Sequence, residues 1–307
     1  MRIGLMHGDD GSQTVQQLVD QLVEEEKEGF DVAWFGQIFG GDSMTVIAVA
    51  GPQTSRIEFA TGVVPTYTRH PFAMAQQALT VNAATGGRFT LGIGPSHGMV
   101  VESMWGMSYD KPAKHMREYL SVLMPLAVSG RVGFNGELYR VNANMAVKDG
   151  MPMRVMISAL APQMLKLAGS QTAGTITWMT GPKTIETHVV PSITKAASEA
   201  GRAAPRVAVG LPIAVTEDVA AAREMASKAF VIYGSLPNYR RMLDKEGAAG
   251  PADVAIVGDE RAVEQQLRDL ASAGATDFIA PIFPVGPDAR ASMTRTRDLL
   301  KSLIGKV

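Results

Sequence analysis

Two histidines in this chain stand where a proton donor would be useful. His7 directly follows the short apolar run Arg2–Met6, and His97 follows the apolar run Phe89–Ile93 after a Gly-Pro-Ser turn. Histidine titrates near neutrality, so either side chain could donate a proton or hydrogen-bond the ring edge of a ligand. A loop histidine with a purely structural role is an equally good interpretation of each.

A second candidate site is the tetrapeptide Thr180-Gly181-Pro182-Lys183. It combines a hydroxyl, a glycine, a proline at a helix start and a lysine in the first turn. Such a stretch brings backbone N–H donors and a positive charge into one place, which suits a phosphate group. A plain helix cap with a solvated lysine explains the same residues equally well.

Other chemistries lack their residues. The chain has no cysteine, its five histidines show no metal-ligand spacing, and G-x-S-x-G is absent. His70 precedes Pro71 at a helix start, whereas His115 and His188 fall inside predicted helices as surface or packing residues. The glycine pair Gly92–Gly94 is followed by proline and does not form a dinucleotide-binding fingerprint. We therefore expect no metal site, and a bound organic cofactor that carries the reaction.

The elements that position these residues alternate regularly. Eight apolar runs read as strands, separated by stretches with helical periodicity. The predicted strands are Arg2–Met6, Asp31–Gly36, Ile57–Val63, Phe89–Ile93, Arg154–Ser158, Thr175–Met179, Val207–Ala214 and Asp277–Ile282. The segment Gly133–Met153 predicts a β-hairpin excursion, and Leu236–Ala255 a helical or loop excursion. Eight β/α units without a linker predict one domain over residues 1–307, a closed (β/α)₈ TIM barrel with insertions.

Polar residues gather just after these strands, where barrels hold their ligands. We expect the loops Gly98–Tyr109 and Ser235–Pro251 to shape a substrate pocket. Four large side chains could line its substrate side or belong to the core, namely Trp34, Tyr67, Met99 and Trp105. The residues that follow the strands include His7 and Asp9, Gln37 and Ile38, Pro95–His97, Ala159 and Leu160, and Thr180–Lys183.

The overall composition favours a small-molecule partner. Lysine and arginine number 29 and aspartate and glutamate 30, with no basic block, which argues against nucleic acid or an anionic membrane surface. No apolar stretch reaches the length of a membrane span, and the first residues do not form a secretory leader. We expect a soluble cytoplasmic protein.

Three stretches carry a resemblance to a known family. They are GFDVAWFGQ at Gly29–Gln37, the run from Ala60 to His97 that contains TGVVPTYTRHP and GGRFTLGIGPSH, and VGDERAVEQQLRDLASAGATDFIAPIF at Val257–Phe283. Together they resemble the bacterial luciferase-like monooxygenase superfamily. Within it, the chain is most similar to coenzyme F420-dependent oxidoreductases such as methylenetetrahydromethanopterin reductase and an actinobacterial glucose-6-phosphate dehydrogenase.

The resemblance implies an F420-dependent oxidoreductase in which deazaflavin C5 exchanges hydride with a small organic substrate. It implies a non-prolyl cis peptide at Gly62–Val63, a cofactor phosphate near the loops after strands five and six, and a homodimer. FMN is the alternative cofactor. The cofactor-binding residues implied are Gln37, Gly62, Val63, Ser96, His97, Ala159, Leu160, Trp178, Met179, Thr180 and Lys183.

The chain departs from the family after its second strand. Several relatives carry an acidic residue and a histidine there, whereas this chain has Gln37 and Ile38. Either His7 or His97 substitutes as the catalytic proton donor, or the substrate accepts hydride without acid assistance. Two alternatives follow: an FMN-dependent luciferase-like monooxygenase, and a non-catalytic deazaflavin carrier or sensor.

Overall fold

The computed structural model describes residues 1–8, 11–37 and 39–307. Eight parallel strands form a closed barrel, because the last strand pairs with both the first and the seventh, and the third with the fourth. This confirms the predicted (β/α)₈ barrel. The barrel strands are β1 (Arg2–His7), β2 (Val32–Phe35), β3 (Glu58–Thr61), β5 (Phe89–Gly94), β8 (Arg154–Ser158), β9 (Gly174–Trp178), β10 (Arg206–Gly210) and β13 (Asp277–Ala280).

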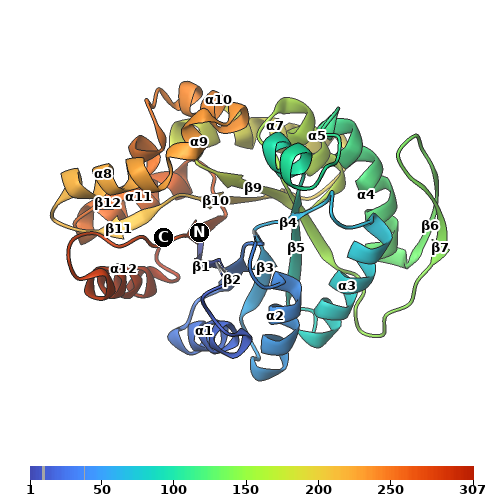
Figure 1. Cartoon of the computed structure of the whole chain (residues 1–307), viewed down its shortest axis with the longest axis horizontal. Coiled ribbons are helices and arrows are strands. Elements are labelled where there is room, and N and C mark those ends of the chain that lie inside the picture. The colour runs from blue at the N-terminus through green and yellow to red at the C-terminus, as the bar shows by residue number, and fades with distance from the viewer. Residues whose placement is uncertain (9–10, 38) are drawn as a thin grey trace.

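Helices surround the barrel on its outside (Figure 1). Their apolar stripes face the strands, as Leu18, Val19 and Leu22 do in the first helix, which begins at a capping box on Thr14 and ends at Gly29 with φ 99°. The main helices are α1 (Val15–Glu28), α2 (Ser43–Ala50), α3 (Pro71–Ala84), α4 (Pro112–Ser129), α5 (Pro162–Gln171), α7 (Val190–Glu199), α8 (Val219–Ala229), α11 (Glu260–Ser272) and α12 (Ala289–Leu303). No helix in the described ranges is long and apolar enough to cross a membrane.

Shorter elements decorate both ends of the barrel. The expected hairpin is present as antiparallel β6 and β7, and it projects beside α4 (Figure 1). The predicted seventh strand, Val207–Ala214, is instead two strands, β10 and β11, and β11 leaves the barrel to pair with β12. The break falls at Pro212, which has no N–H for a ladder. The short elements are β4 (Val64–Pro65), β6 (Arg131–Asn135), β7 (Arg140–Asn144), β11 (Ile213–Val215), β12 (Ile256–Gly258), α6 (Pro182–Thr184), α9 (Val231–Ser235), α10 (Pro237–Glu246), η1 (Gly51–Gln53), η2 (Val100–Met104), η3 (Ile185–Val189) and η4 (Pro251–Val254).

The barrel interior is a packed core and not a pore. Trp34 fills its centre and is fully buried, together with Val32, Ala60, Met156, Ile176, Ala208 and Ile279. The neighbouring strand makes room for the indole with Gly4, where a Cβ would lie 2.8 Å from Trp34 Cδ1. Trp34 therefore lies beneath the mouth of the barrel and does not line an open substrate pocket, contrary to one of the expectations for it.

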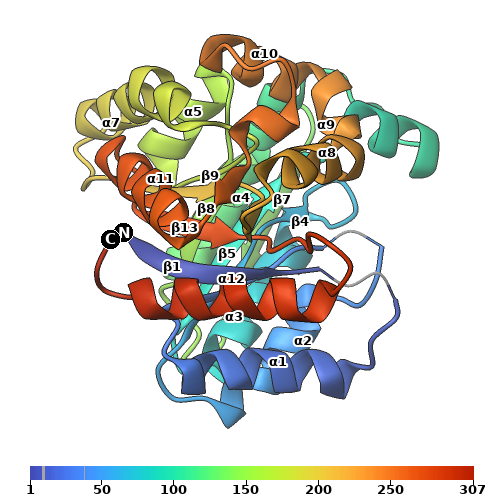
Figure 2. The ribbon, with the colours of Figure 1, turned by 90° about the vertical axis from the view of Figure 1, so that its left-hand side faces the viewer.

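A network of charges closes the amino-terminal end of the barrel. The Glu58 carboxylate accepts hydrogen bonds from Arg206 Nη1 at 2.7 Å, from Arg2 Nη1 at 3.1 Å and from the Thr90 hydroxyl at 2.9 Å. Arg206 Nη2 also lies 2.8 Å from Asp277 Oδ1. These residues come from five different strands. The chain termini meet on the same side, where the Met1 amino group bonds the Val307 carbonyl (Figure 2). Ligand access is therefore left to the opposite end.

Candidate functional site

The cis peptide Gly62–Val63 marks the mouth of the barrel. It joins β3 to β4, which continues the strand alongside β5. The cis bond itself was expected from the family resemblance and is present. Beneath it lies an apolar floor: a Cβ on Gly62 would sit 3.5 Å from Trp34 and 3.7 Å from Met6, and Val63 packs with the same interior cluster. A flat ring could rest on this surface.

His97 lies on the next part of the rim, after β5. Its ring meets Tyr239 of α10 edge-on with centroids 5.6 Å apart, and the Tyr109 hydroxyl donates to the Ser96 carbonyl at 3.0 Å. Burial lowers the pKa of His97, so the imidazole is neutral at pH 7. One ring nitrogen can then donate a hydrogen bond while the other accepts one.

Aromatic side chains form the wall beside β4. Tyr67 stacks on His115 with centroids 4.1 Å apart and planes 7° apart, and Tyr109 lies 5.6 Å away. Burial raises the pKa values of Tyr67 and Tyr109, the second to about 12, so both phenols stay neutral. The Tyr67 hydroxyl is buried and has no hydrogen-bond partner in the described part of the chain. A buried polar group left unpaired needs an explanation, and a bound ligand provides one.

The two loops expected to shape the pocket do meet here. Tyr109 belongs to Gly98–Tyr109 and Tyr239 to Ser235–Pro251, and both touch the Ser96–His97 corner. The individual tyrosines were not singled out by their sequence pattern, because an isolated loop tyrosine carries no periodic signal. His115 is 6% exposed and packs inside the aromatic wall, in agreement with its interpretation as a packing residue.

The structure does not bring His7 to the mouth with His97. His7 has the same orientation along β1 as Ile3 and Leu5, which pack in the outer layer, and its Nε2 pairs with the fully buried Glu25 of α1. Its ring also stacks on Phe35 at 6.2 Å. Geometry therefore favours a structural role for His7, and we carry only His97 forward as a proton-handling candidate.

The loop after β2 is occupied by polar contacts of its own. The Gln37 amide lies 3.0 Å from the Ser43 hydroxyl and within 3.1 Å of the Arg69 guanidinium. Arg69 in turn pairs with Asp42. Gln37 thus helps to fix the start of α2. Ile38 and Asp9 lie outside the described residues.

The residues predicted for the phosphate end lie after β8 and β9, but their backbone groups largely have partners. The Ala159 N–H donates to Thr175 Oγ1 at 3.2 Å, and His188 Nε2 lies 2.8 Å from the Leu160 carbonyl oxygen. Thr180 and Met179 are fully buried, and the Thr180 hydroxyl donates to the Trp178 carbonyl at 3.1 Å. Only the Lys183 side chain of this set projects into solvent.

A carboxylate occupies the cradle at the start of α6. Glu246 accepts the backbone N–H of Lys183 at 3.1 Å and that of Thr184 at 2.8 Å. A Cβ at Gly181 would come within 2.4 Å of Glu246 Cδ, so the glycine leaves the carboxylate its space. The donors expected to hold a phosphate are therefore engaged by a side chain of the protein.

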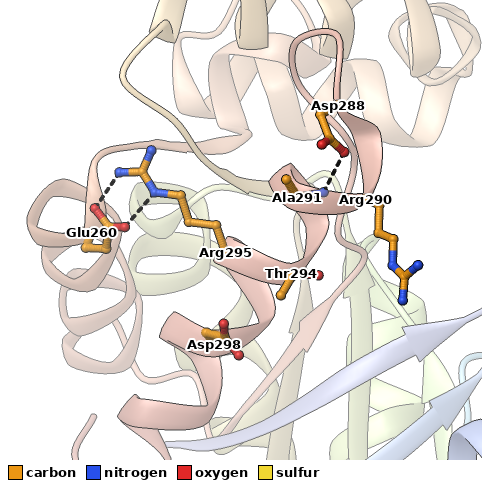
Figure 3. Close-up of a pocket in the computed structure, with 7 residues that line it drawn as sticks. All are labelled: Glu260, Asp288, Arg290, Ala291, Thr294, Arg295 and Asp298. Carbon is orange, nitrogen blue, oxygen red and sulfur yellow. Dashed lines mark hydrogen bonds and ion pairs between the residues drawn. The ribbon is translucent and has the colours of Figure 1, made fainter.

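Two further features lie outside the mouth. Within residues 1–8, 11–37 and 39–307, no three His, Asp or Glu side chains form a group that could hold a metal. A surface hollow beside α11 and α12 is lined by Glu260, Asp288, Arg290, Ala291, Thr294, Arg295 and Asp298 (Figure 3). Glu260, Arg295 and Asp288 have structural partners, since Arg295 binds Glu260 at 2.6 Å and Asp288 caps α12.

Comparison with known proteins places the whole barrel in context. A family model described as luciferase-like monooxygenase matches residues 1–291. The 5,10-methylenetetrahydromethanopterin reductase of Methanopyrus kandleri is 27% identical over 308 residues, covering 86% of this chain and 87% of that protein.

Solved structures share the fold. The coenzyme F420-dependent tetrahydromethanopterin reductase from Methanopyrus kandleri superposes with a TM-score of 0.80 at 23% identity, covering 100% of this chain and 98% of that one. A type II Baeyer–Villiger monooxygenase from Pseudomonas putida in complex with FMN gives 0.76 at 16% identity, covering 100% and 97%.

Proposed function

The chain belongs to the luciferase-like monooxygenase family, and from that premise we propose that it is a coenzyme F420-dependent oxidoreductase acting on a small organic substrate. The reduced deazaflavin, when bound, supplies hydride from its C5. The similarity to a 5,10-methylenetetrahydromethanopterin reductase along most of the chain supports this choice of cofactor. The single observation that carries the proposal is the mouth itself, with an apolar floor at Gly62–Val63 and walls of neutral aromatic side chains.

The protein's own share in this reaction is to position the reactants and to exclude water. Met6 and Val63 provide the surface on which a ring rests, with Trp34 packed beneath them, and Tyr109 and Tyr239 close the side next to His97. In a pocket with few charged groups, orientation of the two reactants provides most of the rate enhancement. We propose Gln37, Gly62, Val63, Ser96 and His97 as contacts at the ring end.

Proton handling falls to neutral groups in this proposal. His97 has a lowered pKa and offers one N–H and one free nitrogen. Tyr67 has a hydroxyl without a partner in the described residues and can donate a hydrogen bond to the cofactor or the substrate. Neither group needs to change charge to orient a polar substrate atom.

The other end of the cofactor would lie along Ala159, Leu160, Trp178, Met179, Thr180 and Lys183. Lys183 is the charged side chain of this set, and it is exposed to solvent. The arrangement with Glu246 in the cradle does not fit a phosphate at the same N–H groups. We therefore assign to Lys183 a charge-assisted contact with the phosphate, and we assign no other role to the residues at this end of the cofactor.

The test is a pair of equilibrium titrations of the purified protein with F420 and with FMN, followed by fluorescence. We expect saturable binding of F420 and weaker binding of FMN. Tight FMN binding without a response to F420 would instead establish the FMN-dependent monooxygenase, which the shared fold with an FMN-bound monooxygenase keeps as the second candidate.

A non-catalytic carrier or sensor is separated from an enzyme by single-turnover oxidation of reduced F420. The panel of acceptors contains enones, imines and nitro compounds, which differ in their need for a proton. Oxidation by at least one acceptor, faster than without protein, supports the enzyme. Binding of F420 with no oxidation by any of them would favour the carrier. The resemblance also leads us to propose a cytoplasmic homodimer, which light scattering on a sizing column would check for mass.

A further inference from the structure

The backbone takes an unusual conformation directly before His97. Ser96 has a φ of 60°, in the left-handed region that residues with a side chain disfavour. A residue stays in this region only where its surroundings impose it, and such residues gather at functional sites. The segment Ser96–Gly98, which we name the His97 corner, therefore needs a partner that holds it.

Tyr109 contacts the His97 corner with both its hydroxyl and its ring. The hydroxyl donates to the Ser96 carbonyl at 3.0 Å, across 13 positions of sequence. A Cβ on Gly98 would lie 3.2 Å from Tyr109 Cδ1, so glycine at this position lets the ring pack against the backbone. One side chain thus holds the residues on both sides of His97.

Tyr109 is itself held from two directions. Its ring lies 5.6 Å from that of Tyr67 in the aromatic wall. The loop that carries it is tied to the corner, because the Val101 N–H donates to the His97 carbonyl at 2.9 Å and the Met107 N–H donates to the Val101 carbonyl at 3.0 Å. Tyr109 is therefore a firm attachment point for the corner.

The direction of the His97 ring depends on this backbone. The ring packs edge-on against Tyr239 with centroids 5.6 Å apart. Among the residues that the structure describes, none forms a hydrogen bond with either ring nitrogen. The backbone of the corner and the contact with Tyr239 therefore set where the imidazole points.

We propose that Tyr109 is the positioning residue for His97 and that it acts through the Ser96 carbonyl. The inference rests on the proposed function for the task of His97, which is to handle the proton. The Tyr109 hydroxyl keeps Ser96 left-handed, and the imidazole then presents its two nitrogens to a bound molecule in one orientation. Without the hydroxyl the corner relaxes and the imidazole loses its fixed direction.

The surroundings of His97 make its pKa a measure of this positioning. Burial lowers the pKa of His97. The side chains that face it are uncharged, since burial raises the pKa of Tyr109 to about 12 and also raises that of Tyr239. Glu102, the loop carboxylate that accepts the Tyr109 N–H at 3.4 Å, is exposed to solvent. A looser corner admits water, so the pKa of His97 then moves up toward its ordinary value of 6.5.

The first experiment titrates the histidine ring protons by NMR in the protein without cofactor, with the His97 signal assigned from its loss in His97→Asn. In Tyr109→Phe we expect the pKa of His97 to shift up toward 6.5. Tyr119→Phe is the matched control, because the buried Tyr119 hydroxyl donates to the Arg69 carbonyl at the same distance of 3.0 Å. It should leave the pKa of His97 unchanged. An unshifted pKa in Tyr109→Phe, or an equal shift in both variants, would overturn the proposal.

A second pair of variants reaches the corner through Ser96 and leaves Tyr109 intact. Ser96→Val places a β-branched side chain where φ is positive, which is strongly disfavoured, whereas asparagine in Ser96→Asn tolerates the left-handed region. We expect Ser96→Val to raise the pKa of His97 as Tyr109→Phe does, and Ser96→Asn to keep the wild-type value. Equal pKa values in the two Ser96 variants would refute the proposal.

The link to the proposed function is measured separately. With reduced F420 and an acceptor that needs a proton, Tyr109→Phe should lower the single-turnover rate about tenfold, a part of the roughly 10²–10⁴-fold that a well-placed acid contributes. The Kd for F420 should change by less than about twofold. A weaker Kd with an unchanged rate would assign Tyr109 to binding and contradict the proposal. If the wild type binds neither F420 nor FMN, the proposed function fails, while a raised His97 pKa in Tyr109→Phe alone still supports the positioning.

Discussion

Replacing Glu58 by glutamine should destabilise the barrel by weakening the charge network at its floor. The carboxylate is 13% exposed and faces Arg206 at 2.7 Å, Arg2 at 3.1 Å and Arg154 at 3.4 Å. The amide removes the negative charge, leaves Arg206 and Arg2 with Asp277 as their remaining carboxylate partner, and takes from Arg154 the carboxylate it pairs with. Breaking a buried ion pair on one side costs about 3–5 kcal/mol. We expect a value near the lower end, about 3 kcal/mol, because Arg2 and Arg154 are partly solvated.

The unfolding midpoint translates this cost into a measurement. Unfolding entropy of about 2.1 cal/mol/K per residue, over 307 residues, means that 3 kcal/mol lowers Tm by about 5 °C. Glu264→Gln is the control, because its partner Arg268 lies one turn away on the surface, and it should change the free energy of unfolding by less than about 0.5 kcal/mol. Urea denaturation at pH 7 measures both variants.

The stabilisation by Glu58 should depend on pH, and the direction of its pKa shift gives the sign of that dependence. Burial acts to raise the pKa of Glu58, but the charges of Arg206 and Arg2 outweigh it and lower the pKa below that of the unfolded chain. The stabilisation is therefore present above pH 4.5 and is lost as pH falls through the folded-state pKa. The difference between wild type and Glu58→Gln should shrink on acidification. A difference that stays constant from pH 7 to pH 3, or a variant as stable as the wild type, would refute the reasoning.

Three further predictions concern single side chains. Glu26→Gln should lower the free energy of unfolding by about 1–2 kcal/mol. Burial acts to raise the pKa of the Glu26 carboxylate, but hydrogen bonds from the N–H groups of Ser55, Arg56 and Ile57 outweigh it and lower the pKa to about 2. Acid titration of stability should show the loss below the usual pKa of 4.5. Burial lowers the pKa of His115 to about 4. The free energy of unfolding should therefore fall by roughly 2–4 kcal/mol as the pH drops from 6.5 to 4. His115→Gln should abolish this pH dependence in urea titrations. Lys183→Ala should weaken F420 binding by about 1–3 kcal/mol without shifting the apo Tm, whereas equal affinity would remove its assigned contact.

The strands could be predicted because buried parallel strands are continuous apolar runs. For the same reason, the sequence did not predict whether the His7 side chain points toward the barrel axis or toward the outer helices. In a strand that is apolar on both faces, alternation does not say which side faces the barrel axis. One signal was readable: Leu18, Leu22 and Glu25 lie on the same face of α1, so a carboxylate occupies a core position and requires a partner. That partner is His7.

The candidate site was predicted unevenly for similar reasons. The cis bond at Gly62–Val63 came from family resemblance, since no local pattern specifies it. The contact of Glu246 with the cradle depends on how α10 docks against α6. These two segments are far apart in the sequence, so no local pattern predicts the contact. The pairing of β11 with β12 has the same origin, because three-residue strands carry too little periodicity to be recognised.

The most direct test of an F420-dependent hydride transfer follows the hydrogen atom itself. Reduced F420 carrying deuterium at C5 is mixed with the protein and an acceptor from the panel, and the product is examined by mass spectrometry and NMR. The proposed function predicts one deuterium at the reduced carbon of the product, without consumption of oxygen. Product without deuterium, or an oxygenated product formed only with reduced FMN and oxygen, would contradict it.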